Sequence, residues 1–103
     1  MGAQTMASRD IGEGVNYDPN LGYSYLAVQR TNGTVVNRGP VTTMYDYAAE
    51  FAVEQLTRLN RIGQARDTAF FIMEIRPGHA MRVVGKAYRS RRGNIVTKEL
   101  VIF

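Results

Sequence analysis

The chain contains no cysteine and only one histidine among its 103 residues, and these absences exclude several kinds of site. Without thiols the protein forms no disulfide bond and no cysteine-based metal site, which is compatible with a reducing compartment. His79 follows the turn signal Pro77-Gly78, and the sequence places no serine or carboxylate beside it. We therefore predict no enzymatic activity, no catalytic residue, no metal site and no cofactor.

Long apolar runs are also missing from the chain. No stretch approaches the length of about 18 apolar residues that suggests a membrane-spanning helix, so no membrane partner is expected. We expect a cytoplasmic protein, or one of the host cytoplasm or the virion if the source is viral. Residues 1–20 contain several Gly and Asn, and their only bulky aliphatic side chains are Ile11 and Val15. We predict a flexible N-terminal arm over residues 1–20 and a single α+β domain over residues 21–103.

The C-terminal third, by contrast, is rich in β-branched and aromatic residues over 67–76 and shows a period-two alternation over 80–90 and 95–103. This pattern and its turn signals predict three strands, at residues 67–76, 80–90 and 95–103. A three-residue loop at 77–79 would place Glu74 opposite Arg82, which pairs opposite charges across the strands. Gly85 interrupts the middle strand and indicates a β-bulge or a close packing point.

Two further elements complete the predicted fold. An Asn32-Gly33 pair predicts a hairpin between residues 23–30 and 34–37. A helix is predicted over residues 43–62, where apolar residues recur at spacings of three and four, Thr43 can act as the N-cap and Gly63 can end the helix. The order is ββαβββ, which predicts an α+β fold with an antiparallel sheet and one amphipathic helix packed on one face.

Both faces of the predicted sheet carry apolar side chains, and one helix can cover only one of them. Either two-residue turn at residues 92–94 gives the same assignment of side chains to faces. The face expected under the helix is the more uniformly apolar one and holds Phe71, Met73, Ile75, Met81, Val83, Ala87, Val96, Leu100 and Ile102. The other face is predicted to be a protein interface and holds Phe70, Ile72, Val84, Tyr88, Val101 and Phe103.

The first functional hypothesis follows from this uncovered face. We predict a small non-enzymatic interaction or assembly protein that forms a homo-oligomer, a dimer in the simplest case, or docks as a subunit on a larger protein complex. A small, basic, cysteine-free chain also fits an accessory protein of a phage or another mobile element.

The alternative hypothesis follows from charge. Residues 1–55 carry three Arg against six acids, whereas residues 56–103 carry ten Lys or Arg against three acids; the two halves, at −3 and +7, give the net charge of +4. Basic side chains next to an aromatic ring can hold phosphates and stack on a base. The residues predicted to bind nucleic acid or another polyanion surround the last hairpin: Lys86, Tyr88, Arg89, Arg91, Arg92 and Lys98.

Overall fold

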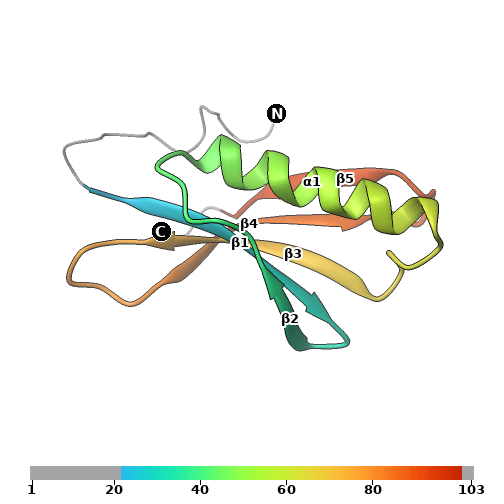
Figure 1. Cartoon of the computed structure of the whole chain (residues 1–103), viewed down its shortest axis with the longest axis horizontal. Coiled ribbons are helices and arrows are strands. Elements are labelled where there is room, and N and C mark those ends of the chain that lie inside the picture. Colours follow the sequence, from blue (N-terminus) through green and yellow to red (C-terminus); the bar gives the residue numbers. More distant parts are fainter. Residues whose placement is uncertain (1–21, 101–103) are drawn as a thin grey trace.

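A computed structural model describes residues 22–100 of the chain and confirms the predicted ββαβββ order (Figure 1). The elements are β1 (Ser24–Thr31), β2 (Thr34–Arg38), α1 (Tyr45–Arg61), β3 (Thr68–Ile75), β4 (Arg82–Arg89) and β5 (Ile95–Glu99). The strands form one antiparallel sheet in the order β2-β1-β3-β4-β5. The predicted arm, residues 1–20, lies outside the described residues.

The helix α1 lies across one face of this sheet (Figure 1). It packs on β1, β3, β4 and β5, and the core between the two layers contains Tyr25, Ala27, Ala48, Ala52, Leu56, Phe70, Ile72 and Ala87. The opposite face of the sheet, hereafter the open face, is not covered by any helix of the described residues. The fold is therefore a two-layer α+β arrangement.

The start of the helix differs from the prediction, whereas its end agrees with it. The N-cap is Met44 and not Thr43, and it makes no side-chain cap hydrogen bond. The hydroxyl of Thr42 instead accepts a bond from the Met44 amide at 3.3 Å. At the other end Gly63 has a φ of 73°, and Gln64 N–H donates to the carbonyl of Leu59 at 2.8 Å. This glycine-based stop is the one that the sequence indicates.

A β-bulge in β4 overturns the predicted assignment of faces. Glu74 lies opposite Arg82 as predicted, but the register shifts beyond Met73, so that Gly85 and not Val84 lies opposite Ile72. One extra residue in β4 reverses every side chain that follows it. Beyond the bulge, Ala87 therefore shares a face with Phe70, and Lys86 and Tyr88 lie on the other face.

The turn between β4 and β5 has three residues, not the two predicted. Ser90 N–H donates to the carbonyl of Asn94 at 2.8 Å, and Gly93 has a φ of 90°. Residues 91–93 form the loop, and Tyr88 pairs with Val96 while Lys86 pairs with Lys98. A three-residue loop ending in a left-handed glycine is a common hairpin connection. Its extra residue offsets the reversal that the bulge causes, so that Val96 shares a face with Phe71, as predicted.

Small residues decide which face the helix covers. Ala48 and Ala52 of α1 are fully buried, as is Ala87 beneath the helix. A Cβ added at Gly85 would overlap the side chain of Tyr45 at the start of α1. The helix can therefore approach the Phe70 face closely, and Gly85 is a close packing point beside the bulge, as the sequence indicates. The prediction that the helix packs on the Phe71 face was wrong.

Candidate functional site

The structure moves half of the predicted protein interface into the core. Phe70, Ile72 and Val84 are 0%, 1% and 5% exposed, because they lie on the face that α1 covers. Tyr88 remains on the open face, while Val101 and Phe103 lie outside the described residues. The three buried residues are thus not available to a partner in the folded domain, and any sheet-mediated contact must use the opposite face.

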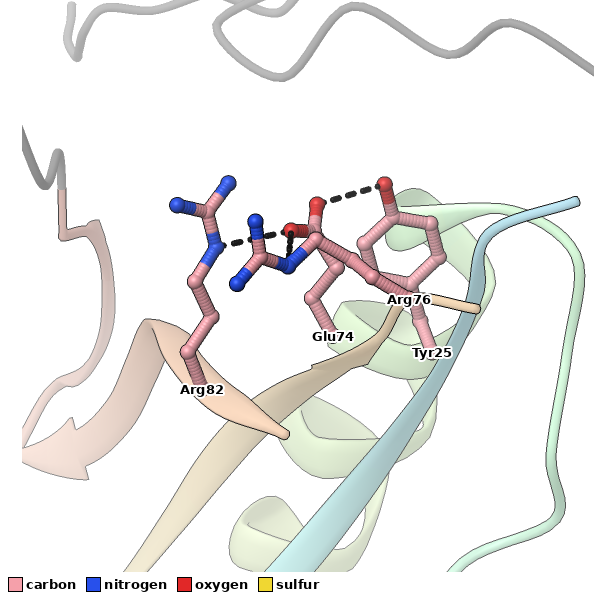
Figure 2. Close-up of polar contacts among 4 residues, drawn as sticks. All are labelled: Tyr25, Glu74, Arg76 and Arg82. Atoms are coloured by element: carbon pink, nitrogen blue, oxygen red, sulfur yellow. Dashed lines mark hydrogen bonds and ion pairs between the residues drawn. The ribbon is translucent and has the colours of Figure 1, made fainter. Parts of the chain in front are cut away.

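A polar row crosses the sheet at one end of the helix-covered face. Figure 2 shows the side chains of Tyr25 and Arg82 reaching Glu74 from the strands on either side of β3. The Tyr25 hydroxyl donates to Oε2 of Glu74 at 3.0 Å, and Nε of Arg82 donates to Oε1 at 2.8 Å. Arg76 forms a longer ion pair with the same Oε1 at 3.7 Å. Glu74 is only 2% exposed, so these donors compensate a buried carboxylate.

The electrostatics of this row indicate a structural role. Burial and, secondarily, the neighbouring Glu74 carboxylate raise the pKa of the Tyr25 hydroxyl far above its usual value. The phenol therefore stays protonated at neutral pH and acts as a hydrogen-bond donor, not as a base. Both oxygens of Glu74 are bonded within the row. The row holds β1, β3 and β4 in register and offers no free nucleophile or base.

Replacing Tyr25 with Phe is expected to lower the free energy of unfolding by about 1 to 3 kcal/mol at neutral pH, because the buried Glu74 oxygen loses its donor. The raised pKa means that the folded state holds the phenolic proton more tightly than the unfolded state. The tyrosine's contribution is thus complete below about pH 10 and is lost as the pH rises further. Urea unfolding from pH 7 to pH 11 should show a decline above pH 10 that is shallower in Tyr25→Phe. Equal declines in both proteins would contradict this assignment.

The open face has a different composition at its two ends. One end is basic, because the strand register places four cations there: Arg30, Arg38, Lys86 and Lys98. None of the described strand positions of this face carries Asp or Glu. Its other end is apolar and contains Leu26, Met73, Ile75 and Val83. The face therefore passes from an apolar end to a basic end that also carries aromatic rings.

Two rings and two cations form a cluster at the basic end of the open face. Phe71 and Tyr88 come from the adjacent strands β3 and β4 and are both partly exposed. The Lys86 ammonium lies 5.7 Å from the Phe71 ring centroid and 5.0 Å from that of Tyr88. The Arg30 guanidinium lies 5.9 Å from the Phe71 ring. These are cation–π distances, so the rings and the charges are held together as one surface; we call these four residues the ring–cation cluster.

Three of the six predicted polyanion-binding residues belong to the open face. Lys86 and Tyr88 are in the ring–cation cluster, and Lys98 lies directly across from Lys86 on β5. Arg89 is turned to the helix side, where its Nε donates to Oδ1 of Asn60 at 3.1 Å. Asn60 in turn donates to the Gly93 carbonyl at 3.0 Å, so Arg89 belongs to a tie between helix and turn.

The remaining predicted residues, Arg91 and Arg92, are exposed in the β4–β5 loop. The sequence interpretation missed Phe71 and Arg30, which the sheet brings next to Lys86 from β3 and β1. Phe71 is predicted to lie under the helix, but it lies on the open face because α1 covers the Phe70 face. Nothing in the local sequence of Arg30 connects it to β4, because that proximity depends on the strand order.

Acidic residues gather on the other side of the molecule. Asp46, Glu50 and Glu54 are exposed on α1, and Glu54 pairs with Arg58 at 4.0 Å, as its i,i+4 spacing predicts. Glu50 and Glu54 line a hollow with Tyr47 and Phe51. The first half of α1 is thus acidic, whereas its last turn carries Arg58 and Arg61. Of these two described surfaces, the acidic half of α1 and the basic end of the open face, the second is the better suited to an anionic ligand.

Other kinds of site find no support in the described part of the chain. His79 is exposed in the β3–β4 loop, and residues 22–100 contain no group of three or more His, Cys, Asp or Glu able to hold a metal ion. Within the same range no helix has the length and apolar character needed to cross a membrane. No family model, curated protein or solved structure matches the chain.

Proposed function

We propose that the protein binds single-stranded nucleic acid on the open face of its sheet. The observation that carries this proposal is the ring–cation cluster, in which the Lys86 ammonium lies within 6 Å of both the Phe71 and Tyr88 rings. Bases stack on exposed aromatic side chains while neighbouring cations hold the phosphates, and this combination serves single strands whose bases are free. A duplex keeps its bases stacked inside and would use only the cations.

A second observation supports the same function. Lys86 and Lys98 are directly opposite each other on adjacent strands, an arrangement of like charges that destabilises a sheet. No Asp or Glu occupies the described strand positions of that face to compensate them. An anionic ligand bound between the two ammonium groups would relieve this repulsion, and it would also release counterions.

The direct test is the binding of a fluorescently labelled single strand of about 12 nucleotides, followed by anisotropy. Tyr88→Leu should weaken binding about tenfold, because stacking contributes about 1 to 3 kcal/mol per base. The matched control is Tyr47→Leu, which removes a tyrosine that is 55% exposed on the acidic helix side, and it should leave the affinity unchanged. No binding by the parent at low salt, or equal losses in the two variants, would refute the proposal.

Self-association through the open face is the second candidate function. The apolar end of this face offers three partly exposed side chains, Met73, Ile75 and Val83. Met81, which directly precedes β4, is 52% exposed. This retains the assembly hypothesis but transfers it to the face opposite the one predicted. A light-scattering mass at increasing concentration distinguishes the two candidates. A dimer that dissociates when the single strand is added would favour a shared surface, whereas a monomer at all concentrations would remove the second candidate.

A further inference from the structure

A hollow of about 490 Å³ lies at the basic end of the open face and extends to Thr68 and Arg89, which belong to the helix side of the sheet. Ala69 lies between Arg30 on β1 and Tyr88 on β4 in the sheet register, so a small side chain is flanked by two long ones. Phe71 and Lys86 of the ring–cation cluster line the same hollow. The space is therefore continuous with the proposed stacking surface and is large enough to admit one base.

The rim of this hollow is polar and is held in place by two hydrogen bonds. It consists of the β1–β2 turn, Asn32 and Gly33, and of Arg66 and Asp67 before β3. Asn32 N–H donates to the carbonyl of Asp67 at 3.1 Å, which joins the turn to the loop. Arg30 donates to the carbonyl of Gly33 at 2.8 Å, which fixes the wall next to the rim. A preformed polar rim over an aromatic wall can read the edge of a bound base.

From this geometry, and resting on the proposed function, we infer that the hollow is a subsite selective for guanine. Among the described residues that line it, Asp67 is the one acidic residue, and an ionised carboxylate only accepts hydrogen bonds. Guanine presents two adjacent donors, N1–H and the N2 amino group, and two acceptors, O6 and N7. The donors match a carboxylate, and the acceptors match a guanidinium such as that of Arg66.

The other bases fit this rim less well. Cytosine and adenine each present one amino donor beside an unprotonated ring nitrogen. That nitrogen would face an oxygen of the Asp67 carboxylate, and two acceptors cannot form a hydrogen bond. Uracil and thymine present a single N–H between two carbonyl oxygens, which the carboxylate would repel. A carboxylate within a basic, phosphate-binding surface weakens the general attraction for a polyanion. We therefore expect Asp67 to determine which base is bound and not to increase the overall affinity.

The test uses four single strands that are poly-thymidine except for one central position, which is G, A, C or T. The full chain should bind the strand with G about tenfold more tightly than the other three, as one bidentate contact allows. Asp67→Asn should abolish that preference while retaining, or slightly improving, the affinity for the all-thymidine strand. The control Asp46→Asn removes one carboxylate from the helix side and should leave the preference intact.

The outcomes separate this inference from the function on which it rests. Equal binding of all four strands by the parent, or a G preference that survives Asp67→Asn, would overturn the guanine subsite and leave single-strand binding in place. Absence of binding to every strand would overturn both. Loss of preference in both variants would mean that charge alone, and not the position of Asp67, governs selection.

Discussion

Replacing Phe70 with Glu is expected to unfold the domain, whereas the same substitution at the next residue, Phe71, should leave it folded. Phe70 is 0% exposed and its ring packs edge-on against Phe51 of α1, with 6.2 Å between ring centroids. The substitution removes a core aromatic, which costs about 3 to 5 kcal/mol, and adds a buried unpaired carboxylate. That total is comparable to the whole stability of a typical small domain, about 5 to 15 kcal/mol.

Phe71 is the matched control because it has the same side chain on the same strand but points to the open face. A Glu at this position would lie near Arg30 and Lys86, the two cations that flank the present ring. The fold should therefore survive, with a loss of about 1 to 2 kcal/mol, while single-strand binding is reduced. Far-UV circular dichroism with a urea titration measures the first effect and anisotropy the second. A folded Phe70→Glu, or a Phe71→Glu that unfolds, would contradict the face assignment.

The same two residues show how far the sequence can predict the fold. Period-two alternation and the turn signals identify the three C-terminal strands, and opposite charges identify the pairing of Glu74 with Arg82. They do not reveal which residue of Val83-Val84 is the extra one in the bulge, because both are β-branched and apolar. A shift of one residue reverses the part of β4 beyond the bulge, which brings Ala87 to the Phe70 face. The list of elements is therefore correct, whereas the face predicted to lie under the helix is wrong.

The prediction of the site was limited by the same physical cause. The charge of the last hairpin predicts Lys86, Tyr88 and Lys98 as polyanion-binding residues. The same charge also predicts Arg89, but this residue contacts Asn60, which is 29 residues away in the sequence. The small residues Gly85 and Ala87 indicate which face of β4 the helix covers, since a helix can approach a sheet most closely where side chains are short.

Charge reversal on the open face should have the largest effect on binding. Lys86→Glu together with Lys98→Glu is expected to weaken binding of a labelled single strand by about 100-fold at about 50 mM salt, because two phosphate contacts become repulsive. The slope of affinity against salt should fall by about two counterion units, one for each lost contact. The control is Arg91→Glu with Arg92→Glu, which changes the net charge equally in the exposed β4–β5 loop and should weaken binding much less.

The stability of these variants separates binding from folding. Lys98→Glu alone converts an opposed pair of like charges into an attractive pair with Lys86, so it should raise the free energy of unfolding by about 0.2 to 1 kcal/mol while weakening binding. Adding Lys86→Glu restores a like-charged pair, and the gain in stability should disappear while binding weakens further. The free energy of unfolding would thus rise with the first substitution and fall with the second, whereas the affinity for the single strand would fall at both steps. Such a divergence is expected if the lysine pair is kept for its ligand at a cost to the fold; affinity that follows stability through the series would instead assign the pair a structural role.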